Sequence, residues 1–174
     1  MDGSTDTLCK KVAEALSDSG FDVSFVYPHS LNIGHCVNCN KCKDLKRCAF
    51  FDGMDEIYEK INSSSILVLG TPVHFSGISS VLKQVIDRFQ LYWYHTPSKK
   101  RVVGLVANGG NKNPYFNNII SESTSVSNTL NGKWSGALTV RETDLGGLND
   151  LVFQDAYRFG ESLASSALRL LKLS

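Results

Sequence analysis

Four of the five cysteines in this sequence lie between residues 36 and 48, in the spacing C-x2-C-x2-C-x5-C. Cysteines two residues apart can turn their sulfurs toward one point, so Cys36, Cys39, Cys42 and Cys48 are candidate ligands of one inorganic centre. Four thiolates match the ligand count of a [4Fe–4S] cluster and also that of a tetrahedral zinc site. Zinc sites more often use two C-x-x-C pairs separated by a longer stretch, so the spacing favours iron–sulfur. Free thiols or two disulfides are the alternatives.

Length and composition indicate one globular domain spanning residues 1–174, with a cysteine-rich loop at residues 34–52. The chain has 174 residues, of which 42% are hydrophobic and 20% charged, a balance typical of soluble proteins. A formal net charge of +1 gives no electrostatic attraction to nucleic acid or to a membrane surface. We see neither a signal peptide nor a membrane-spanning apolar run. These features predict a cytoplasmic protein, in which thiols stay reduced and a cysteine cluster binds metal or is redox-active.

The apolar pattern predicts helices and strands in alternation. The expected helices are Thr7–Ser17, Met54–Ile61, Ser79–Tyr92, Asn117–Leu130 and Leu148–Leu171. The expected strands are Phe21–Tyr27, Ser65–Leu69, Arg101–Ala107 and Gly136–Val140. Strands that alternate with helices form a parallel sheet with helices on both faces, which is an α/β fold.

Ligands of such sheets bind beyond the carboxyl ends of the strands, which selects four loops. These loops are residues 1–7, the cysteine loop, residues 71–77 and residues 108–114. In the first loop, the small hydroxyl residues Ser4 and Thr5 and the backbone amides at the start of a helix suit a phosphate, although for such a cluster alone a plain N-cap is the more usual explanation. In the third, His74 and Phe75 could flank a flat aromatic ligand, or His74 could have no role. A simple turn is the alternative for the glycines after Asn108.

Several of these segments resemble the motifs of one family. The segment Gly3-Ser4-Thr5-Asp6-Thr7-Leu8 resembles a G-N-T-x-x-L phosphate loop, and Asp52-Gly53-Met54 resembles D-D-M. Thr71-Pro72-Val73-His74-Phe75 resembles [ST]-P-V-Y-F, and the segment from Leu82 to Arg88 resembles L-K-x-[FV]-I-D-R. These motifs are those of the flavodoxin-like NADPH-dependent FMN reductase superfamily. The cysteine spacing is similar to that of its iron–sulfur flavoprotein branch, whose members carry FMN and a [4Fe–4S] cluster.

The resemblance implies roles for the matching residues. The residues expected at the flavin are Ser4 and Thr5 at its phosphate, Pro72, Val73, His74 and Phe75 along its ring, and Asn108, Gly109 and Gly110 at the ring edge. The expected cluster ligands are Cys36, Cys39, Cys42 and Cys48, with zinc as the alternative occupant. We expect Asp87 and Arg88 to fix helix and subunit packing, and Cys9 to lie in the core. No general acid or nucleophile is assigned.

The resemblance also implies a flavodoxin-like three-layer sandwich with strand order 2-1-3-4-5. The sequence starts inside the phosphate loop, so the first, central strand of that sheet is apparently missing from it. Its removal would leave a gap of about 10 Å, two strand spacings, in the sheet. We therefore expect an apolar strand encoded upstream of Met1, direct pairing of the second and third strands, or a strand supplied by a partner chain.

The function implied is that of an FMN-dependent electron-transfer oxidoreductase that couples the flavin to a [4Fe–4S] cluster. Its donor and acceptor would be among NAD(P)H, ferredoxin and quinones. One alternative is a cluster-free NAD(P)H-dependent FMN or quinone reductase, and another is a truncated, non-enzymatic module stabilised by zinc. Three consecutive aromatics, Tyr92, Trp93 and Tyr94, cannot all face one core from a helix, which predicts a homodimer or higher homo-oligomer.

Overall fold

The computed structural model describes residues 3–172, so Met1 and Asp2 of the expected phosphate loop lie outside the described residues. The helices are α1 (Ser4–Asp18), α2 (Cys42–Leu45), α3 (Met54–Ser63), α4 (Ser80–Arg88), α5 (Gln90–Tyr94), α6 (Asn117–Thr129) and α7 (Asp150–Leu171). Two short 3-10 turns, η1 (Pro28–Ser30) and η2 (Thr143–Leu145), occur in loops. The strands are β1 (Ile66–His74), β2 (Gly77–Ile78), β3 (Arg101–Asn108) and β4 (Gly132–Val140).

The strands form one sheet in the order β2-β1-β3-β4. Strands β1, β3 and β4 are parallel, as the alternation with helices predicts, and β2 pairs antiparallel with the last residues of β1. Every residue of β3 is buried, because β3 has a strand on each side and helices over both faces. A continuous apolar run such as Val102 to Ala107 is typical of this position in a parallel sheet.

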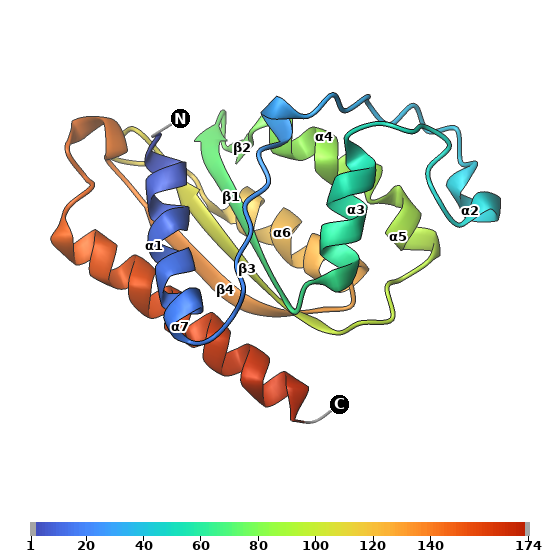
Figure 1. Cartoon of the computed structure of the whole chain (residues 1–174). Helices are drawn as coiled ribbons and strands as arrows, with labels where there is room; N and C mark the ends of the chain where they lie inside the picture. The colour runs from blue at the N-terminus through green and yellow to red at the C-terminus, as the bar shows by residue number, and fades with distance from the viewer. Residues whose placement is uncertain (1–2, 173–174) are drawn as a thin grey trace.

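Helices cover the sheet on both faces, giving three layers (Figure 1). Helices α1 and α7 pack on one face, where they form a core with Val102 and Val106 of β3. Helices α3, α4, α5 and α6 pack on the other face, where the core includes Leu105 and Ala107 of the same strand. Alternate residues of β3 thus serve opposite cores, as the period of two in a strand requires.

A bulge in β4 keeps its apolar residues on the correct face. Between two paired positions the register advances two residues on β3, from Val103 to Leu105, but three on β4, from Trp134 to Ala137. The additional residue falls beside Gly136, whose φ of +104° is a conformation that glycine adopts most easily. Trp134 and Ala137 therefore pack against the same core although they are an odd number of residues apart.

The segment Phe21–Tyr27 is not a strand, and this prediction is wrong. It is extended but has no β-pairing among the described residues, and Phe25 and Tyr27 are 40% and 39% exposed. A strand exists only where its amides and carbonyls meet those of a neighbour, and this segment is placed by side chains instead. Val23 packs against the α1–α7 core and Val26 against the opposite one. Direct pairing of this segment with β1 is therefore also wrong.

Strand β1 continues further than expected, into the segment that we expected to be a ligand-binding loop. The predicted strand ended at Leu69, but Pro72 is still in register with Asn108 of β3. The true turn consists of Phe75 and Ser76, with φ of +49° and +62°, before β2 begins. Two positive φ angles in a row are those of a tight two-residue hairpin, which most often contains Asn or Gly.

The single helix expected from Ser79 to Tyr92 is two helices, α4 and α5, that separate at Phe89. Ser79 caps α4 by accepting a hydrogen bond from the amide of Leu82, and Phe89, with ψ near 4°, ends that helix. Apolar periodicity continues across the break, which is why the sequence pattern does not reveal it. The other expected helices are confirmed, with bounds that shift by a few residues.

Candidate functional site

The carboxyl edge of the sheet brings together the three segments expected at a flavin. Helix α1 begins there at Ser4, and its Thr5 lies against Gly70 of β1, where an added Cβ would lie 3.4 Å from the Thr5 methyl carbon. The ends of β1 and β3 meet at the same edge, with Pro72 in register with Asn108. The structure therefore places the start of α1 beside the ends of both strands.

A chain of hydrogen bonds joins these segments to one another. The Thr5 hydroxyl donates to the side-chain oxygen of Asn108, and the Asn108 amide nitrogen donates to the Thr143 hydroxyl at 3.2 Å. Asn108 is only 6% exposed, so both ends of its side chain are held inside the protein. Asn108 thus positions the start of α1 and the η2 turn, and its expected contact with a flavin edge stays a prediction.

Packing within the protein explains the glycines after Asn108. A Cβ added at Gly109 would lie 2.3 Å from Pro114, and one at Gly110 would lie 2.0 Å from a carboxylate oxygen of Asp144. Backbone hydrogen bonds tie the same turn to the η2 segment, from Thr143 to Gly109 and from Asp144 to Gly110. Gly109 is therefore required for its own loop to fold back on Pro114, and Gly110 for that loop to approach the η2 segment, whether or not a ligand also lies there.

The hairpin after β1 carries the other residues expected along a flavin ring. Val73 packs against the core under α3 and α4, whereas the His74 side chain is exposed. Phe75 is entirely exposed, at 106% of its reference area, and has the positive φ described above. A large aromatic held in solvent in an unfavourable conformation suggests a constraint beyond folding of the hairpin itself.

The start of α1 fits the phosphate of FMN on one structural observation. Gly3 is the N-cap and provides no side-chain acceptor, so within the described residues no side chain caps the first-turn amides of this 15-residue helix. Amides at a helix start favour an anion because they point outward and carry the positive end of the helix dipole. Asp6 stands in the same turn, but its carboxylate is paired with Lys10 and accepts a hydrogen bond from Tyr27.

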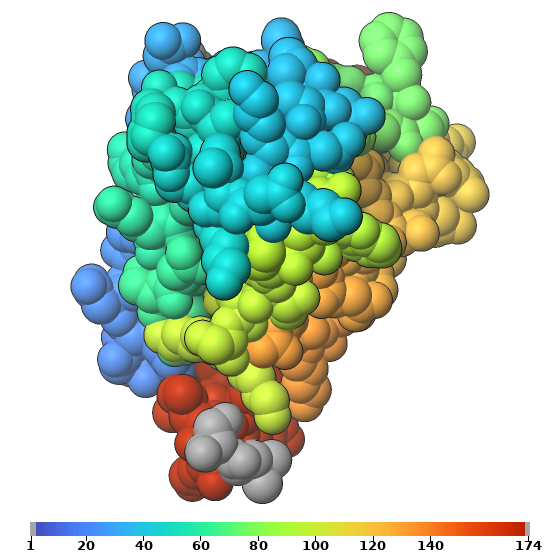
Figure 2. All heavy atoms as spheres, turned by 90° about the vertical axis from the view of Figure 1, so that its right-hand side faces the viewer, coloured from blue at the N-terminus to red at the C-terminus, as the bar shows by residue number. Residues whose placement is uncertain are grey.

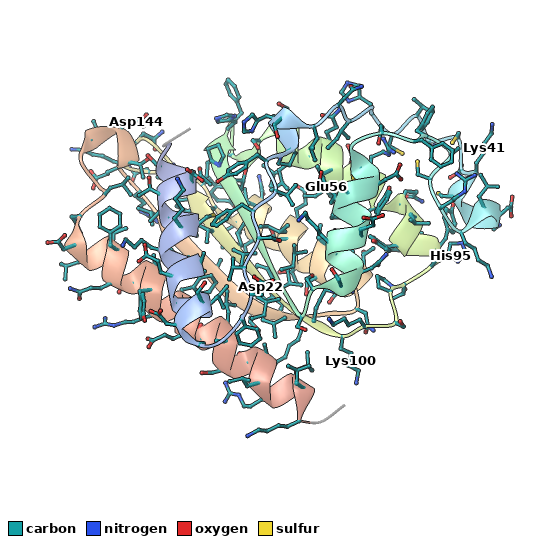
Figure 3. All side chains as sticks on the ribbon, viewed as in Figure 1. Asp22, Lys41, Glu56, His95, Lys100 and Asp144 are labelled. Carbon is teal, nitrogen blue, oxygen red and sulfur yellow. The ribbon has the colours of Figure 1, made fainter. Side chains whose placement is uncertain are left out.

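The four clustered cysteines lie at another end of the molecule from the η2 turn. Figure 3 shows Lys41 and His95, beside the cysteine loop, far from Asp144. Cys36, Cys39, Cys42 and Cys48 all line one small hollow, whose other walls include Tyr58, Arg88 and Leu91. In Figure 2 the loop covers this end of the molecule, above the residues of α4 and α5.

The donor set fits a sulfur-ligated group, whereas the arrangement of the sulfurs does not form a closed site. Cys36 and Cys39 are exposed, Cys48 is half-buried and Cys42 is buried. Burial raises the pKa of the Cys42 thiol, and the other three cysteines add smaller contributions in the same direction. Across residues 3–172, no three His, Cys, Asp or Glu side chains are gathered closely enough to hold a metal ion.

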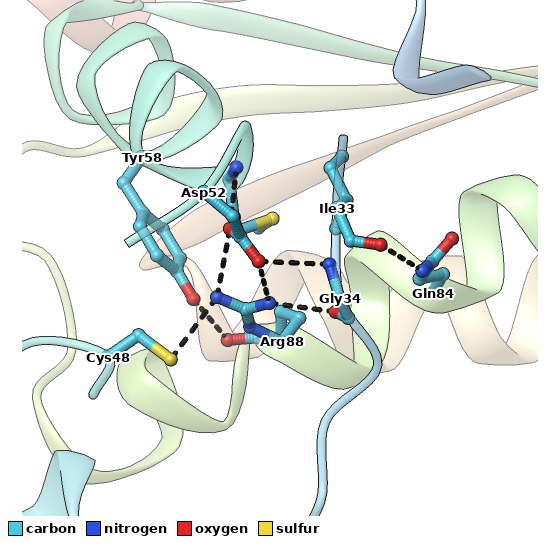
Figure 4. A network of polar contacts seen from close by, with 8 residues as sticks. Ile33, Gly34, Cys48, Asp52, Tyr58, Gln84 and Arg88 are labelled. Carbon is cyan, nitrogen blue, oxygen red and sulfur yellow. Dashed lines mark hydrogen bonds and ion pairs between the residues drawn. The ribbon is translucent and has the colours of Figure 1, made fainter. Parts of the chain in front are cut away.

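Arg88 fastens the cysteine loop to α4 (Figure 4). Its guanidinium forms a bidentate ion pair with Asp52, with N–O distances of 2.8 and 3.2 Å, and donates to the Gly34 carbonyl at 2.7 Å. It also donates to the Cys48 sulfur at 3.2 Å. Burial alone would raise the pKa of Asp52, but hydrogen bonds from Arg88, Gly34 and Met54 outweigh it and hold that pKa below the ordinary value.

The aromatic run of α5 also serves the loop. Tyr92 is buried, Tyr94 donates a hydrogen bond from its hydroxyl to Asn40 at 3.2 Å, and the His95 ring contacts the carbonyls of Cys42 and Lys43. Only Trp93, at 71% exposure, points away from the protein. The run therefore divides between the core, the cysteine loop and solvent.

The sequence alone does not reveal the residues that support the sheet edge and the cysteine loop. Thr143 and Asp144 were not candidates, because a short polar turn carries no pattern of its own. Arg88 and Asp52 were noticed as parts of motifs, but Arg88 was expected to serve packing only. Cys9 of α1, expected in the core, is partly buried and its sulfur lies against Gly70 of β1. Burial raises the pKa of its thiol to about 12.

None of the helices in the described part of the chain has the length and apolar character needed to cross a lipid bilayer. The profile of a protein family described as NADPH-dependent FMN reductase matches residues 1–121. A protein of Methanocaldococcus jannaschii named iron-sulfur flavoprotein is 30% identical over 112 residues, which are 64% of this chain and 58% of that protein. The chain spans about half the length of the curated relatives it matches.

Solved structures share the fold at low sequence identity. A flavone reductase superimposes with a TM-score of 0.76 and 17% identity, covering 97% of this chain and 60% of that one. A flavodoxin, WrbA-like protein from Agrobacterium tumefaciens superimposes with a TM-score of 0.66 and 14% identity, covering 96% and 91%. These similarities confirm the expected flavodoxin-like α/β fold.

Proposed function

Because the chain belongs to the NADPH-dependent FMN reductase family, we propose that it is an FMN-dependent oxidoreductase that couples the flavin to a [4Fe–4S] cluster in electron transfer. The observation that carries the proposal is that all four clustered cysteines line one hollow, in a chain whose sheet edge fits FMN. The name of the M. jannaschii relative, iron-sulfur flavoprotein, supports the same pair of cofactors. NAD(P)H, ferredoxin or a quinone would be the electron partner, and the cytoplasm would keep the thiols reduced.

In this proposal the chain's own residues bind and orient the flavin. The first-turn amides of α1, with the hydroxyls of Ser4 and Thr5, hold the phosphate. The backbone from Pro72 to Phe75 lines the ring, with Phe75 available to cover its face. Asn108, Gly109 and Gly110 form the turn at the ring edge. Bound FMN would supply exchange between two-electron and one-electron transfer, which a cluster alone does not perform.

The cysteine ligands would hold the cluster outside the flavin site. Cys42 is the buried member of the set, whereas Cys36 and Cys39 are exposed, and the proposal requires their thiols to close on the same group. Sulfur-only ligation suits iron–sulfur chemistry better than hard cations. The hydrogen bond from Arg88 shows that the Cys48 sulfur already faces a cationic donor.

A cluster-free NAD(P)H-dependent FMN or quinone reductase is the second candidate. It is favoured by the absence, within residues 3–172, of three potential ligands close enough for a metal ion. A zinc-stabilised module without FMN is the third. The visible spectrum separates the three, since flavin absorbs in two bands, a cluster adds a broad brown shoulder, and zinc adds nothing.

The decisive experiment is anaerobic reconstitution with iron and sulfide, followed by analysis of both elements. We expect about four irons per wild-type chain, as a complete cubane requires. Cys42→Ser should lose most of them, because it removes the buried ligand. Cys9→Ala is the matched control, since Cys9 lies in α1 and outside the loop, and it should keep the wild-type content.

Two results would reject the cluster as described. Fewer than about two irons per wild-type chain would leave the cluster-free reductase as the better reading. Full iron retention in Cys42→Ser would mean that the ligands are other residues. Binding of FMN is measured independently, by quenching of flavin fluorescence on titration with the apoprotein.

A further inference from the structure

Arg88 is a cation buried beneath the cysteine loop. Its side chain is 1% exposed, compared with 13% for that of Asp52, its partner in the ion pair. The Tyr58 hydroxyl donates to the Arg88 carbonyl at 2.7 Å, and the Phe50 ring lies 5.8 Å from the guanidinium. Burying a guanidinium costs free energy unless it is paired with an opposite charge and hydrogen-bonded. The partners that compensate this cost therefore indicate the role of Arg88.

The partners of Arg88 are spread along the whole cysteine loop. Gly34 lies two residues before the first cysteine of the cluster, Cys48 is the last of them, and Asp52 lies four residues beyond it. One guanidinium therefore joins the beginning and the end of the loop to α4. A planar fork can donate in several fixed directions at once, which a lysine ammonium on a flexible stem cannot reproduce.

We propose that Arg88 is a positioning residue for the sulfur-ligated group, which closes the cysteine loop onto α4 and raises the reduction potential of the group through its hydrogen bond to the Cys48 sulfur. The inference rests on the proposed function, because it needs a redox group at these cysteines. It assigns to Arg88 more than the packing role that its motif suggests.

The direction of the effect follows from charge. Reduction adds one electron to the group, and no bond to the protein forms or breaks. A hydrogen bond from a cation to a ligand sulfur stabilises the more negative, reduced state and so raises the potential. The Asp52 carboxylate offsets part of this effect, because its negative charge is paired with the same guanidinium and shares the Nη2 donor with the Cys48 sulfur. Removing the Arg88 charge should therefore lower the reduction potential, and removing the Asp52 charge should raise it.

The test compares Arg88→Met, Arg88→Lys and Asp52→Asn with the wild type after anaerobic reconstitution. Potentials are measured by titration with dithionite, which supplies the electron, and the reduced state is followed by electron paramagnetic resonance. We expect Arg88→Met to lower the potential by about 59 mV or more, a tenfold change in the ratio of oxidised to reduced group. Asp52→Asn should raise it, and Arg88→Lys should stay closer to the wild type because the charge remains.

Closure of the loop is measured on the apoprotein, where no cluster is needed. The loop contains four exposed trypsin sites at Lys41, Lys43, Lys46 and Arg47. With thiols reduced, we expect trypsin to cut the loop several-fold faster in both Arg88 variants than in the wild type. Arg158→Met is the matched control, because Arg158 lies on α7 and is 70% exposed, and it should change neither the potential nor the cleavage.

The two readouts distinguish the possible failures. If the wild type binds no iron, the proposed cluster and the effect of Arg88 on its potential are both wrong. The rate of trypsin cleavage still tests whether Arg88 holds the loop closed. An iron-loaded Arg88→Met with the wild-type potential would overturn the tuning role alone. Potentials that shift in the same direction in Arg88→Met and Asp52→Asn would mean that both variants merely loosen the site. If Arg88→Met does not fold, Arg88→Lys and Asp52→Asn still decide both points.

Discussion

The side chains expected to bind FMN at the sheet edge also form hydrogen bonds that hold this edge together. The Thr5 hydroxyl has a single proton, which it donates to Asn108 at the end of β3, so it can donate to a phosphate at the start of α1 only by turning away from Asn108. Asn108 passes the connection on to Thr143. The residues expected to bind FMN are therefore also those that hold this edge together, so their substitution should affect ligand affinity and local order at once.

At this scale we predict that Thr5→Val weakens FMN binding. Valine removes the hydroxyl that would turn from Asn108 to the phosphate, and also the bond to Asn108 that orders the start of α1. A hydrogen bond to a charged group is worth about 1.5–3 kcal/mol, so the Kd should rise roughly tenfold. Titration of the apoprotein against FMN fluorescence gives the value. Thr129→Val is the control, since the Thr129 hydroxyl only donates to the Ser125 carbonyl on α6. Equal Kd values for Thr5→Val and the wild type would remove Thr5 from the phosphate site.

Among the elements, β1 and α1 have unusual surroundings. Strand β1 pairs with β3 along most of its length, but it meets β2 only at Val73 and His74. Within the described residues its opposite edge is therefore unpaired from Ile66 to Pro72, although the extended segment before η1 runs past it (Figure 1). An unpaired edge of a sheet is the place where a further strand can add.

Hydrogen exchange should reveal that edge. In a parallel pair only alternate residues of a strand bond to a given neighbour, so about half of the β1 amides before Pro72 should exchange quickly. The amides of β3, which has a strand on each side, should all be protected. Residue-resolved exchange of the purified chain measures both. Equal protection of β1 and β3 would show that another strand pairs with β1 in solution.

The crossing of α1 and α7 depends on one glycine. A Cβ at Gly160 would lie 2.6 Å from the Val12 carbonyl oxygen and 2.7 Å from the Ala15 Cβ. We predict that Gly160→Ala lowers the free energy of unfolding by about 1–2 kcal/mol, because overpacking outweighs the roughly 1 kcal/mol that alanine adds to a helix. Urea unfolding measures the change. Glu161→Ala, at the next, exposed position of α7, should show no such loss, and a more stable Gly160→Ala would contradict the close crossing.

On the scale of the whole molecule, Asp144 of the η2 turn and the cysteine loop beside Lys41 and His95 lie at different ends of the described structure (Figure 3). The flavin residues gather where the parallel strands end, whereas the cysteine loop covers the ends of α4 and α5. Trp93 of α5 is exposed, whereas its neighbours Tyr92 and Tyr94 have partners within the chain. An unpartnered tryptophan there is consistent with a surface covered by a second copy.

We therefore predict a homodimer or higher oligomer that depends on Trp93. Light scattering at micromolar concentration should give at least twice the chain mass for the wild type. Trp93→Ser should shift the distribution toward the monomer, because it removes a large aromatic side chain that is 71% exposed. Tyr115→Ser, at 52% exposure on another surface segment, is the control. A wild type that is monomeric throughout this range would count against the prediction.

Local sequence patterns were sufficient to predict most of the helices and strands. Helix periodicity located α1, α3, α6 and α7, and buried apolar runs located β1 and β3, because burial repeats along the chain with the period of each element. The cysteine spacing and the loop motifs selected four cysteines that line one hollow and segments that meet at the sheet edge, since short motifs keep their residues together in sequence, and the ligand roles stay predictions. The family profile confirms the resemblance drawn from those motifs.

Only the tertiary structure decided the features that depend on distant neighbours. The segment Phe21–Tyr27 has the composition of a strand, yet without a partner its backbone cannot form a ladder. Phe89 ends α4 inside an unbroken apolar pattern. Arg88 reaches Asp52, 36 positions away, and Gly34, 54 positions away, and no local signal records such pairs. Strand pairing and buried ion pairs are set by which elements pack together, whereas helix and strand tendencies are set by adjacent residues.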